Sequence, residues 1–247
     1  MNTIKQKSVR TAHCAVRTKA ESWKMFDEIS PKYDLLNRLL SFGIDGHWRR
    51  CLGKFLVLKQ KKNVLDLATG TGDVLLSLIK QRPQIEKGVG VDLAEKMFAI
   101  ATKKVEKAGL QNKISFKNGN AARLMFGDSS FDNATIAFGI RNIPDPLSAL
   151  REMDRVLVDG GRAIILEFSL PENPLLKAVH LFYLRNVVPF IGGLVSGHAQ
   201  AYRYLNQSIE TFAYGQDFCD LMLASGFSMA KAYPLFGGVA TIYVGEK

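Results

Sequence analysis

The sequence predicts a doubly wound α/β fold, in which helices cover both faces of a parallel sheet. The first observation is the apolar run Val64–Leu67, which is interrupted only by Asp66 and is typical of a strand covered on both faces. The second is a turn at Gly70 and Gly72 that leads into a helix with an apolar stripe. The third is the alternation of strands and helices, with short turns, up to residue 168. With 247 residues, the chain is long enough for one such domain with an appendage.

The glycine turn predicts a nucleotide-binding crevice. The pattern is Asp66-x-Ala68-x-Gly70-x-Gly72, and Asp73 opens the helix. A dinucleotide would place a pyrophosphate on that helix end, where two carboxylates would repel it. They suit a cationic ligand with ribose hydroxyls, such as S-adenosylmethionine. The alternative is that the glycines only turn the chain.

The second strand, Gly88–Val91, ends at Asp92. An acid one βα unit after the glycine turn fits a ligand of the ribose hydroxyls. Asp92 can also cap the following helix, Ala94–Ala108, and the two roles are compatible.

The third strand is Ile114–Lys117, and Gly119-Asn120-Ala121 follows at its carboxyl end. Ligands bind at this edge of such sheets. The Asn120 side chain and a backbone N–H, such as that of Ala121, are therefore expected to hold the two edges of an adenine.

The fourth strand, Asn133–Phe138, leads into Gly139-Ile140-Arg141-Asn142, where we expect the group that faces the reacting atom. There is no Asn/Asp-Pro-Pro-Tyr/Phe run and no nearby cysteine, which argues against methylation of base amino groups and against covalent cytosine methylation. Arg141 and Asn142 are candidates for orienting an oxygen-bearing substrate. The alternative is an ordinary surface arginine. A helix to Leu157 and a fifth strand, Ala163–Phe168, complete the alternation.

A helical cap over residues 21–60 precedes the first strand. Its predicted helices are Glu21–Ile29, a second over 33–40 after an interruption at Ser30-Pro31, and a third from Asp45 to about Leu58. The spacing places Tyr33 and Asn37 on one helix face, which is also compatible with an ordinary polar surface.

Residues 171–204 interrupt the α/β rhythm. The mostly apolar segment Leu175–Val195 predicts a buried helical pair. The alternative is a lid that binds a hydrophobic substrate or a membrane surface. No run of about 18 uninterrupted apolar residues occurs, so we predict no membrane span. Two helices, Asn206–Tyr214 and Phe218–Ser225, and two closing strands, Phe227–Ala232 and Val239–Val244, follow.

The basic leader, Met1–Ala20, has five Lys/Arg and no Asp/Glu, and so supplies half of the net charge of +10. It is expected to be a disordered tail, with contact to anionic lipid or nucleic acid, or organelle targeting, as alternatives. Cys14, Cys51 and Cys219 have no C-x-x-C spacing, which argues against a zinc site or a disulfide framework and suits a reducing compartment.

Four further motifs, in order, carry a resemblance to a family. They are Met25-Phe26-Asp27 with Tyr33-Asp34-x-x-Asn37-x-x-Leu40-Ser41 and Trp48; Phe138 to Asn142; Arg155-Val156-Leu157-x-x-Gly160-Gly161 leading to Leu166-Glu167-Phe168-Ser169; and Tyr202-Arg203-Tyr204-Leu205-x-x-Ser208-Ile209. From about Met25 to Lys247 the chain resembles the ubiquinone/menaquinone biosynthesis C-methyltransferases. These are class I S-adenosylmethionine-dependent enzymes with a Rossmann-like sheet, so residues 21–247 are expected to form a single domain.

The resemblance implies methyl transfer from S-adenosylmethionine to a ring carbon of a polyprenylated quinol, with demethylmenaquinol as the favoured acceptor. The alternatives are a ubiquinone-pathway 2-methoxy-6-polyprenyl-1,4-benzoquinol, or another lipid or small molecule. It implies cofactor contacts at Thr71, Asp92, Asn120 and Ala121, beside the turn residues Asp66, Gly70 and Gly72. It places Arg141 over the acceptor ring, with Tyr33 and Asn142 near it.

The same resemblance implies no metal and no nucleic-acid partner. It implies a cytoplasmic enzyme, peripheral at the inner face of the membrane, or one in the mitochondrial matrix if the source is eukaryotic. A homodimer stays open.

The chain departs from the family pattern at four places. Asp45 replaces a histidine, with His47 displaced next to Trp48, and Val158-Asp159 replaces Lys-Pro. Gly197-His198-Ala199-Gln200 replaces an acid or amide cluster, and Ala137 replaces a small polar residue. The Asp45 and His198 departures concern the part of the chain expected to bind the substrate head group.

Overall fold

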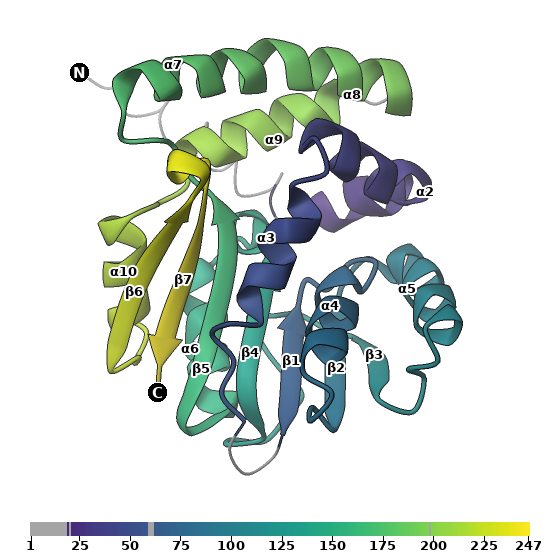
Figure 1. Cartoon of the computed structure of the whole chain (residues 1–247), viewed down its shortest axis with the longest axis vertical. Coiled ribbons are helices and arrows are strands. Elements are labelled where there is room, and N and C mark those ends of the chain that lie inside the picture. Colours follow the sequence, from purple (N-terminus) through teal and green to yellow (C-terminus); the bar gives the residue numbers. More distant parts are fainter. Residues whose placement is uncertain (1–18, 20, 59–61, 198) are drawn as a thin grey trace, which may run out of the picture.

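A seven-stranded sheet with the order β3-β2-β1-β4-β5-β7-β6 forms the centre of the computed structural model, which describes residues 19, 21–58, 62–197 and 199–247 (Figure 1). The basic leader, apart from Lys19, and His198 lie outside the described residues. The strands are β1 Asn63–Leu67, β2 Lys87–Asp92, β3 Ile114–Asn118, β4 Phe131–Ala137, β5 Leu157–Phe168, β6 Met229–Leu235 and β7 Ala240–Glu246.

The sheet is mixed, which corrects the expectation of a parallel one. β1 to β5 pair in parallel, whereas β7 is antiparallel to both β5 and β6. The reason is the short 3₁₀ connection Phe236–Gly238 between β6 and β7, because a parallel pairing would need a crossover of a dozen or more residues.

Helices cover both faces of the sheet, as a doubly wound fold requires. One core cluster packs α6 (Pro146–Val156) and α10 (Gln216–Leu223) on one face. A second packs α3 (Asp45–Leu52), α4 (Asp73–Gln81) and α5 (Glu95–Lys107) on the other. The expected β-α alternation is therefore confirmed over this part of the chain.

The first cap helix, α2 (Ser22–Leu40), runs through Pro31 without interruption, so the predicted break at Ser30-Pro31 was wrong. Proline has no N–H for the carbonyl four residues earlier, which is that of Asp27. The Ser30 hydroxyl donates to this carbonyl at 2.9 Å and replaces the missing bond.

The third cap helix, α3, ends at Leu52 and not near Leu58. After Gly53 the chain runs beside β4, where the Val57 N–H donates to Asn133 Oδ1 at 3.0 Å and the Asn133 amide donates to the Val57 carbonyl at 2.5 Å. This exchange with a buried asparagine replaces the helical bonds.

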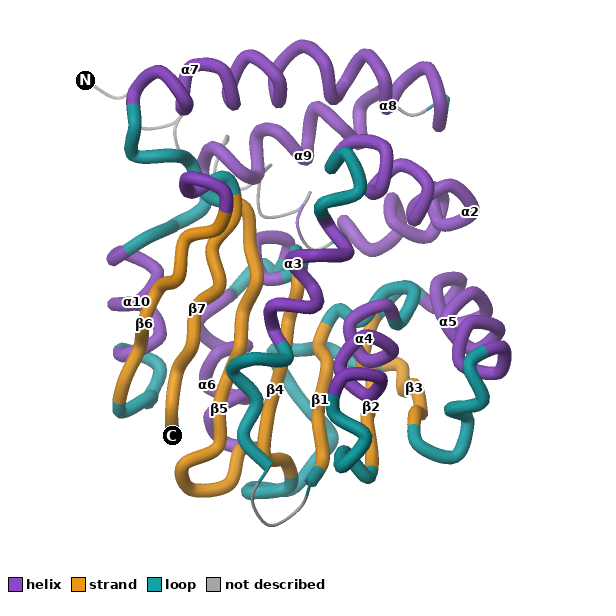
Figure 2. The backbone as a smooth tube through the Cα atoms, in the orientation of Figure 1, coloured by secondary structure: helices purple, strands orange, loops and turns teal. Residues whose placement is uncertain are grey.

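A long helix lies across the top of the molecule (Figure 2). It consists of α7 (Pro174–Phe182), a π-helical turn η2 (Tyr183–Val187) and α8 (Val188–Ser196), with α9 (Ala199–Thr211) packed below it. A third core cluster joins its inner face to α2 and α9.

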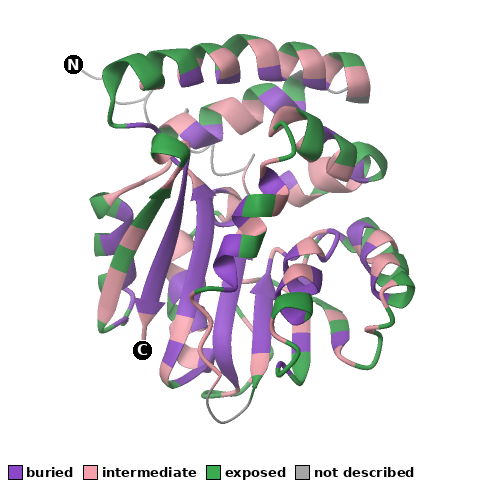
Figure 3. Ribbon diagram, viewed as in Figure 1, coloured by how far each residue is buried: buried purple, intermediate pink, exposed green. Residues whose placement is uncertain are grey.

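Pro174–Val195 is long and apolar enough to cross a membrane by length and composition, with a mean hydropathy of 1.4. The segment passes this test although Arg185 and Asn186 interrupt its apolar run, and the test does not show that the helix spans a membrane. Its inner side packs on α9 and α2, whereas large apolar residues are exposed on its outer side (Figure 3).

Candidate functional site

Two adjacent cavities lie above the carboxyl ends of the parallel strands. We call them the polar cavity, of about 230 Å³, which contains Gly70, Asp92 and Asn120, and the apolar cavity, of about 320 Å³, which lies beneath α7 to α9. They share four lining residues: Phe26, Tyr33, Phe138 and Asn142. A ligand in one cavity therefore ends where a ligand in the other begins.

Asp92 fixes the geometry of the polar cavity. Its Oδ2 accepts the Gly70 N–H at 2.8 Å and its Oδ1 accepts the Ala94 N–H at 2.9 Å. Burial raises the pKa of this carboxyl, and the backbone donors act in the opposite direction. A carboxylate has about four acceptor sites, so sites beyond those used by the backbone donors suit a hydroxyl-bearing ligand such as a ribose. Asp92 thus bonds Ala94, the N-cap residue of α5, and also lines the cavity, while its contact with a ribose stays a prediction.

The other lining residues of the polar cavity come from three strand ends. Ala68 and Gly70 lie in the turn after β1, with backbone φ angles of +47° and +54°, a region that strongly favours glycine. Asn120 and Ala121 follow β3 and line the same cavity. Asn120 Oδ1 accepts the Ala122 N–H at 2.9 Å, which holds this side chain in place.

Asp66, Thr71 and Gly72 are not among the residues that line either cavity. The Asp66 carboxyl is fully buried and accepts the hydroxyls of Thr69 and Thr135, each at 2.6 Å. The Thr71 hydroxyl donates to Asp34 at 2.7 Å. Asp66 and Thr71 are thus engaged with other protein groups. The cofactor contacts implied for all three residues stay predictions.

Burial raises the pKa of Asp66 to about 7, whereas the carboxyl of an unfolded chain titrates near about 4. Between these two pH values the carboxyl is protonated in the folded state and ionised in the unfolded state. The free energy of unfolding therefore falls by about 1.4 kcal/mol for each pH unit of increase across this range. We expect Asp66→Asn to remove this slope in the free energy of unfolding, measured by denaturant titration from pH 4 to 7.5. Parallel wild-type and variant profiles would contradict the assignment.

An ionic cluster links the cap to the glycine turn. Lys104 Nζ lies 2.5 Å from Asp34 Oδ2 and 2.6 Å from Asp73 Oδ1, and it donates to the Thr71 hydroxyl at 2.9 Å. The charge of Asp73 is thus balanced by a cation, and the raised pKa of Asp66 reduces the charge of that carboxyl near neutral pH. The argument that Asp66 and Asp73 would repel a pyrophosphate therefore does not apply to the polar cavity. In the described lining of the polar cavity, the carboxylate is that of Asp92 and the cation is Lys19.

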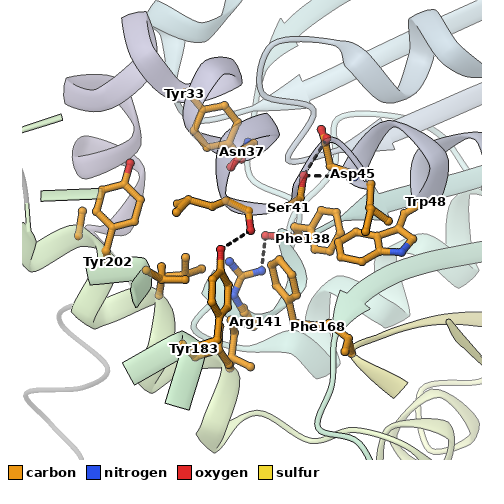
Figure 4. Close-up of a pocket in the computed structure, with 18 of the residues that line it drawn as sticks. Tyr33, Asn37, Ser41, Asp45, Trp48, Phe138, Arg141, Phe168, Tyr183 and Tyr202 are labelled. Carbon is orange, nitrogen blue, oxygen red and sulfur yellow. Dashed lines mark hydrogen bonds between the residues drawn. The ribbon is translucent and has the colours of Figure 1, made fainter. Parts of the chain in front are cut away.

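Arg141 is buried at the apolar cavity, with 3% of its surface exposed, which excludes the surface alternative. Its Nη1 donates to the Phe138 carbonyl at 2.6 Å (Figure 4). The same Nη1 donates to Glu167 Oε1 at 2.6 Å, and Nε donates to Ser208 Oγ at 3.2 Å. The guanidinium lies 5.3 Å from the centre of the Phe168 ring. Its Nη2 has no bonding partner among the described residues, which leaves two N–H donors for a ligand.

Glu167 was not singled out as a site residue. It is 1% exposed at the end of β5 and pairs with Arg141, and burial raises its pKa while Arg141 acts against that shift. A signal was available, because an acid inside the apolar strand Ala163–Phe168 requires a buried partner.

Tyr33 and Asn142 meet at the wall between the cavities. Asn142 Oδ1 accepts the Tyr204 hydroxyl at 3.2 Å, and the Tyr33 ring packs edge-on against Phe26 with centroids 6.1 Å apart. Burial raises the pKa of Tyr33, with a hydrogen bond from Asn37 acting in the opposite direction. The structure therefore brings Tyr33, Asn142 and Arg141 to one cavity, and the catalytic roles that the resemblance implies for them stay predictions.

The Asp45 departure also lies at the apolar cavity. Its carboxylate accepts the Ser41 hydroxyl at 2.9 Å and pairs with Arg49. His47 does not line this cavity and lies 3.5 Å from Cys51 Sγ. Within the described ranges, no group of three or more His, Cys, Asp or Glu side chains is arranged to hold a metal ion.

The fold occurs in solved structures of S-adenosylmethionine-dependent methyltransferases. One from Thermotoga maritima matches with a TM-score of 0.65 and 20% identity, over 91% of this chain and 99% of that one. The [4+2]-cyclase SpnF matches with a TM-score of 0.60 and 16% identity, over 91% of this chain and 94% of that one. Since a cyclase shares the fold, the fold alone does not assign the reaction.

The sequence comparisons are more specific. The chain is 46% identical over 224 residues to the ubiquinone/menaquinone biosynthesis C-methyltransferase UbiE of Geotalea uraniireducens, covering 91% of this chain and 95% of the relative. It is 47% identical over 223 residues to the demethylmenaquinone methyltransferase of Thermus thermophilus, covering 90% of this chain and all of that protein. The model of the ubiE/COQ5 methyltransferase family matches residues 15–247. This chain is therefore a member of the ubiE/COQ5 methyltransferase family.

Proposed function

We propose that this methyltransferase transfers the methyl group of S-adenosylmethionine to a ring carbon of a polyprenylated quinol, converting demethylmenaquinol to menaquinol. The observation that carries the proposal is the pair of cavities that meet at Tyr33, Phe138 and Asn142. One is polar and contains a carboxylate for a ribose, and the other is apolar and contains a buried arginine. The names of the relatives agree with this acceptor.

On the donor side, the residues of the polar cavity fit the cofactor. Asp92 has acceptor sites for the two ribose hydroxyls, and Asn120 and Ala121 lie where an adenine edge would be held. When bound, S-adenosylmethionine supplies an electrophilic methyl group. Asn142 and Tyr33 form the wall toward which that methyl would face.

On the acceptor side, Arg141 acts on the quinol oxygen. A quinol that has released its hydroxyl proton to solvent pushes electron density to the ortho carbon, which would attack the methyl in line as the methyl–sulfur bond breaks and S-adenosylhomocysteine leaves. Loss of the ring proton from the methylated carbon to solvent then restores the aromatic ring. The free Nη2 donors of Arg141 stabilise the quinol oxyanion and so favour the deprotonated acceptor. Phe138 and Phe168, whose ring centroids are 4.4 Å apart, hold the ring plane. Alignment of the two reacting carbons contributes an effect of up to about 7–11 kcal/mol in favourable cases.

The test is a methyl-transfer assay with labelled S-adenosylmethionine and two acceptors in detergent, a short-chain demethylmenaquinol and a demethylated benzoquinol. We expect label in the naphthoquinol product. Label only in the benzoquinol would show that the acceptor is a ubiquinone precursor and not demethylmenaquinol. Label in neither, while the cofactor still binds, would overturn the quinol assignment.

We propose further that the outer side of α7 and α8 lies on the cytoplasmic surface of a membrane. Its exposed apolar residues recur one helical turn or two apart, and they are Leu175, Val179, Phe182, Phe190 and Leu194. The apolar cavity lies beneath the same helix, so a polyprenyl tail would need to travel only a short distance from the lipid. Apolar side chains on one face of an interfacial helix favour such binding.

We expect Phe182→Ser with Phe190→Ser to lower partitioning onto lipid vesicles at least about tenfold, since each fully buried Phe stabilises by about 1.5–3 kcal/mol. Co-sedimentation with vesicles measures this effect. Leu223→Ser, at an exposed apolar residue of α10, is the matched control and should not change it. If the double substitution instead dissociates a homodimer in sedimentation velocity without lipid, the face is a subunit contact and not a membrane surface.

A further inference from the structure

His180 is a buried base in the apolar cavity that the reaction described above does not use. It lies on the inner side of α7 with 8% of its surface exposed, and Leu184 and Val188 follow at intervals of four residues on the same side. All three line the apolar cavity. The positions of Leu184 and Val188 require only apolar packing, so an imidazole in the same row needs a reason.

The Nε2 of His180 has no hydrogen-bond partner among the described residues, although the atom is fully buried. Such an orphaned polar group carries the full cost of its desolvation. Burial lowers the pKa of His180, which keeps the ring neutral at neutral pH. A neutral imidazole has one nitrogen that accepts a hydrogen bond and one that donates.

Several other polar groups of this cavity are already engaged. Tyr183 donates to the Leu40 carbonyl at 2.8 Å, Tyr204 donates to Asn142, and Asp45 pairs with Arg49. Trp48 Nε1 also lacks a partner, but Figure 4 shows this nitrogen on the edge of the indole that points away from Arg141. His180 and the Nη2 of Arg141 are therefore two groups of the described lining that a polar ligand can satisfy.

We propose that the His180 imidazole turns when the acceptor binds, so that its buried Nε2 forms a hydrogen bond with the ring oxygen that Arg141 does not hold, and so selects rings with two oxygens. This inference rests on the proposed function, because a quinol has two hydroxyls on opposite sides of its ring. Arg141 then takes the oxygen next to the reacting carbon, and His180 takes the distant one. The bond fixes which ring carbon faces the methyl group.

The test compares acceptors with and without the second oxygen. The wild-type protein and His180→Phe are assayed with a prenylated 1,4-naphthoquinol and with the matching prenylated 1-naphthol. We expect wild-type kcat/KM to be about tenfold higher for the diol, the usual size of a lost neutral hydrogen bond, and the variant to lose this preference. Leu184→Met, which changes the next turn without changing polarity, is the control and should keep the preference.

Three readouts separate this role from a packing role. His180→Phe should raise KM for the diol more than it lowers kcat, leave cofactor affinity unchanged, and not lower the melting temperature, because it removes an orphaned group. His180→Asn should restore part of the preference. A variant that methylates both acceptors with the wild-type preference would overturn the inference while leaving quinol methylation intact.

Binding is measured in parallel, so the inference can be decided even without turnover. Trp48 lines the same cavity and reports occupancy through its fluorescence. Titration of the S-adenosylhomocysteine complex with 1,4-dihydroxynaphthalene and with 1-naphthol should show tighter binding of the diol in the wild type and equal binding in His180→Phe. If the preference is present but no label is transferred, the proposed methyl transfer fails, while recognition of the second ring oxygen by His180 is supported as a binding property. If wild type and variant bind both compounds alike, the inference is wrong.

Discussion

Replacing Arg141 with alanine is expected to lower the rate of methyl transfer at least about 100-fold, the usual effect of removing one donor to a developing oxyanion. The free Nη2 donors of Arg141 are the groups that we assign to the quinol oxygen. Cofactor affinity should change little, because Arg141 lines only the apolar cavity. The measurements are kcat with labelled cofactor and the Kd of S-adenosylhomocysteine by calorimetry.

The same substitution leaves Glu167 buried without its counterion, and breaking a buried pair in this way costs about 3–5 kcal/mol of stability. The double variant Arg141→Gln with Glu167→Gln avoids that cost, since it leaves no unpaired charge. We expect it to fold and to bind cofactor, but to transfer no methyl. If the double variant turns over at the wild-type rate, Arg141 has no part in the reaction.

Asp92→Ala is expected to weaken cofactor binding about 100-fold, because hydrogen bonds to a charged group contribute about 1.5–3 kcal/mol each. Calorimetry with S-adenosylhomocysteine measures the loss. At saturating cofactor, kcat should recover, since Asp92 lines only the polar cavity.

Asp92 also holds the Gly70 N–H, so its loss can loosen the turn. A cofactor analogue that lacks the 2′-hydroxyl separates the two effects. The wild-type protein should bind the analogue more weakly than the natural ligand, whereas Asp92→Ala should bind both alike. If the variant still discriminates between them, the carboxylate does not hold the ribose.

The parts of this fold that depend on local pattern could be predicted from the sequence. The apolar run Val64–Leu67 predicted a buried strand, and Gly70 and Gly72 after it predicted a turn. The acids and amides at strand ends indicated the polar cavity. The structural roles of these residues follow from the residues next to them in the sequence. The helix through Pro31 could not be foreseen in this way, because a side chain supplies the bond that the proline removes.

Interactions between distant residues were less accessible. Lys104 sits in a helix of ordinary surface composition, and its contact with Asp34 depends on the position of the cap over the sheet. Glu167 meets Arg141 across 26 residues, from two adjacent strand ends. Likewise, the spacing of His180 identified it only as an interruption of an apolar segment, and its burial follows from the packing of α7 on α9.

Helix α2 contributes Phe26 and Tyr33 to both cavities, and its Asp34 is held to the glycine turn by Thr71 and to α5 by Lys104. The affinities for the two ligands are consequently linked through one helix. If bound cofactor raises the affinity for the acceptor by some factor, bound acceptor must raise the affinity for the cofactor by the same factor, because coupling free energy is reciprocal.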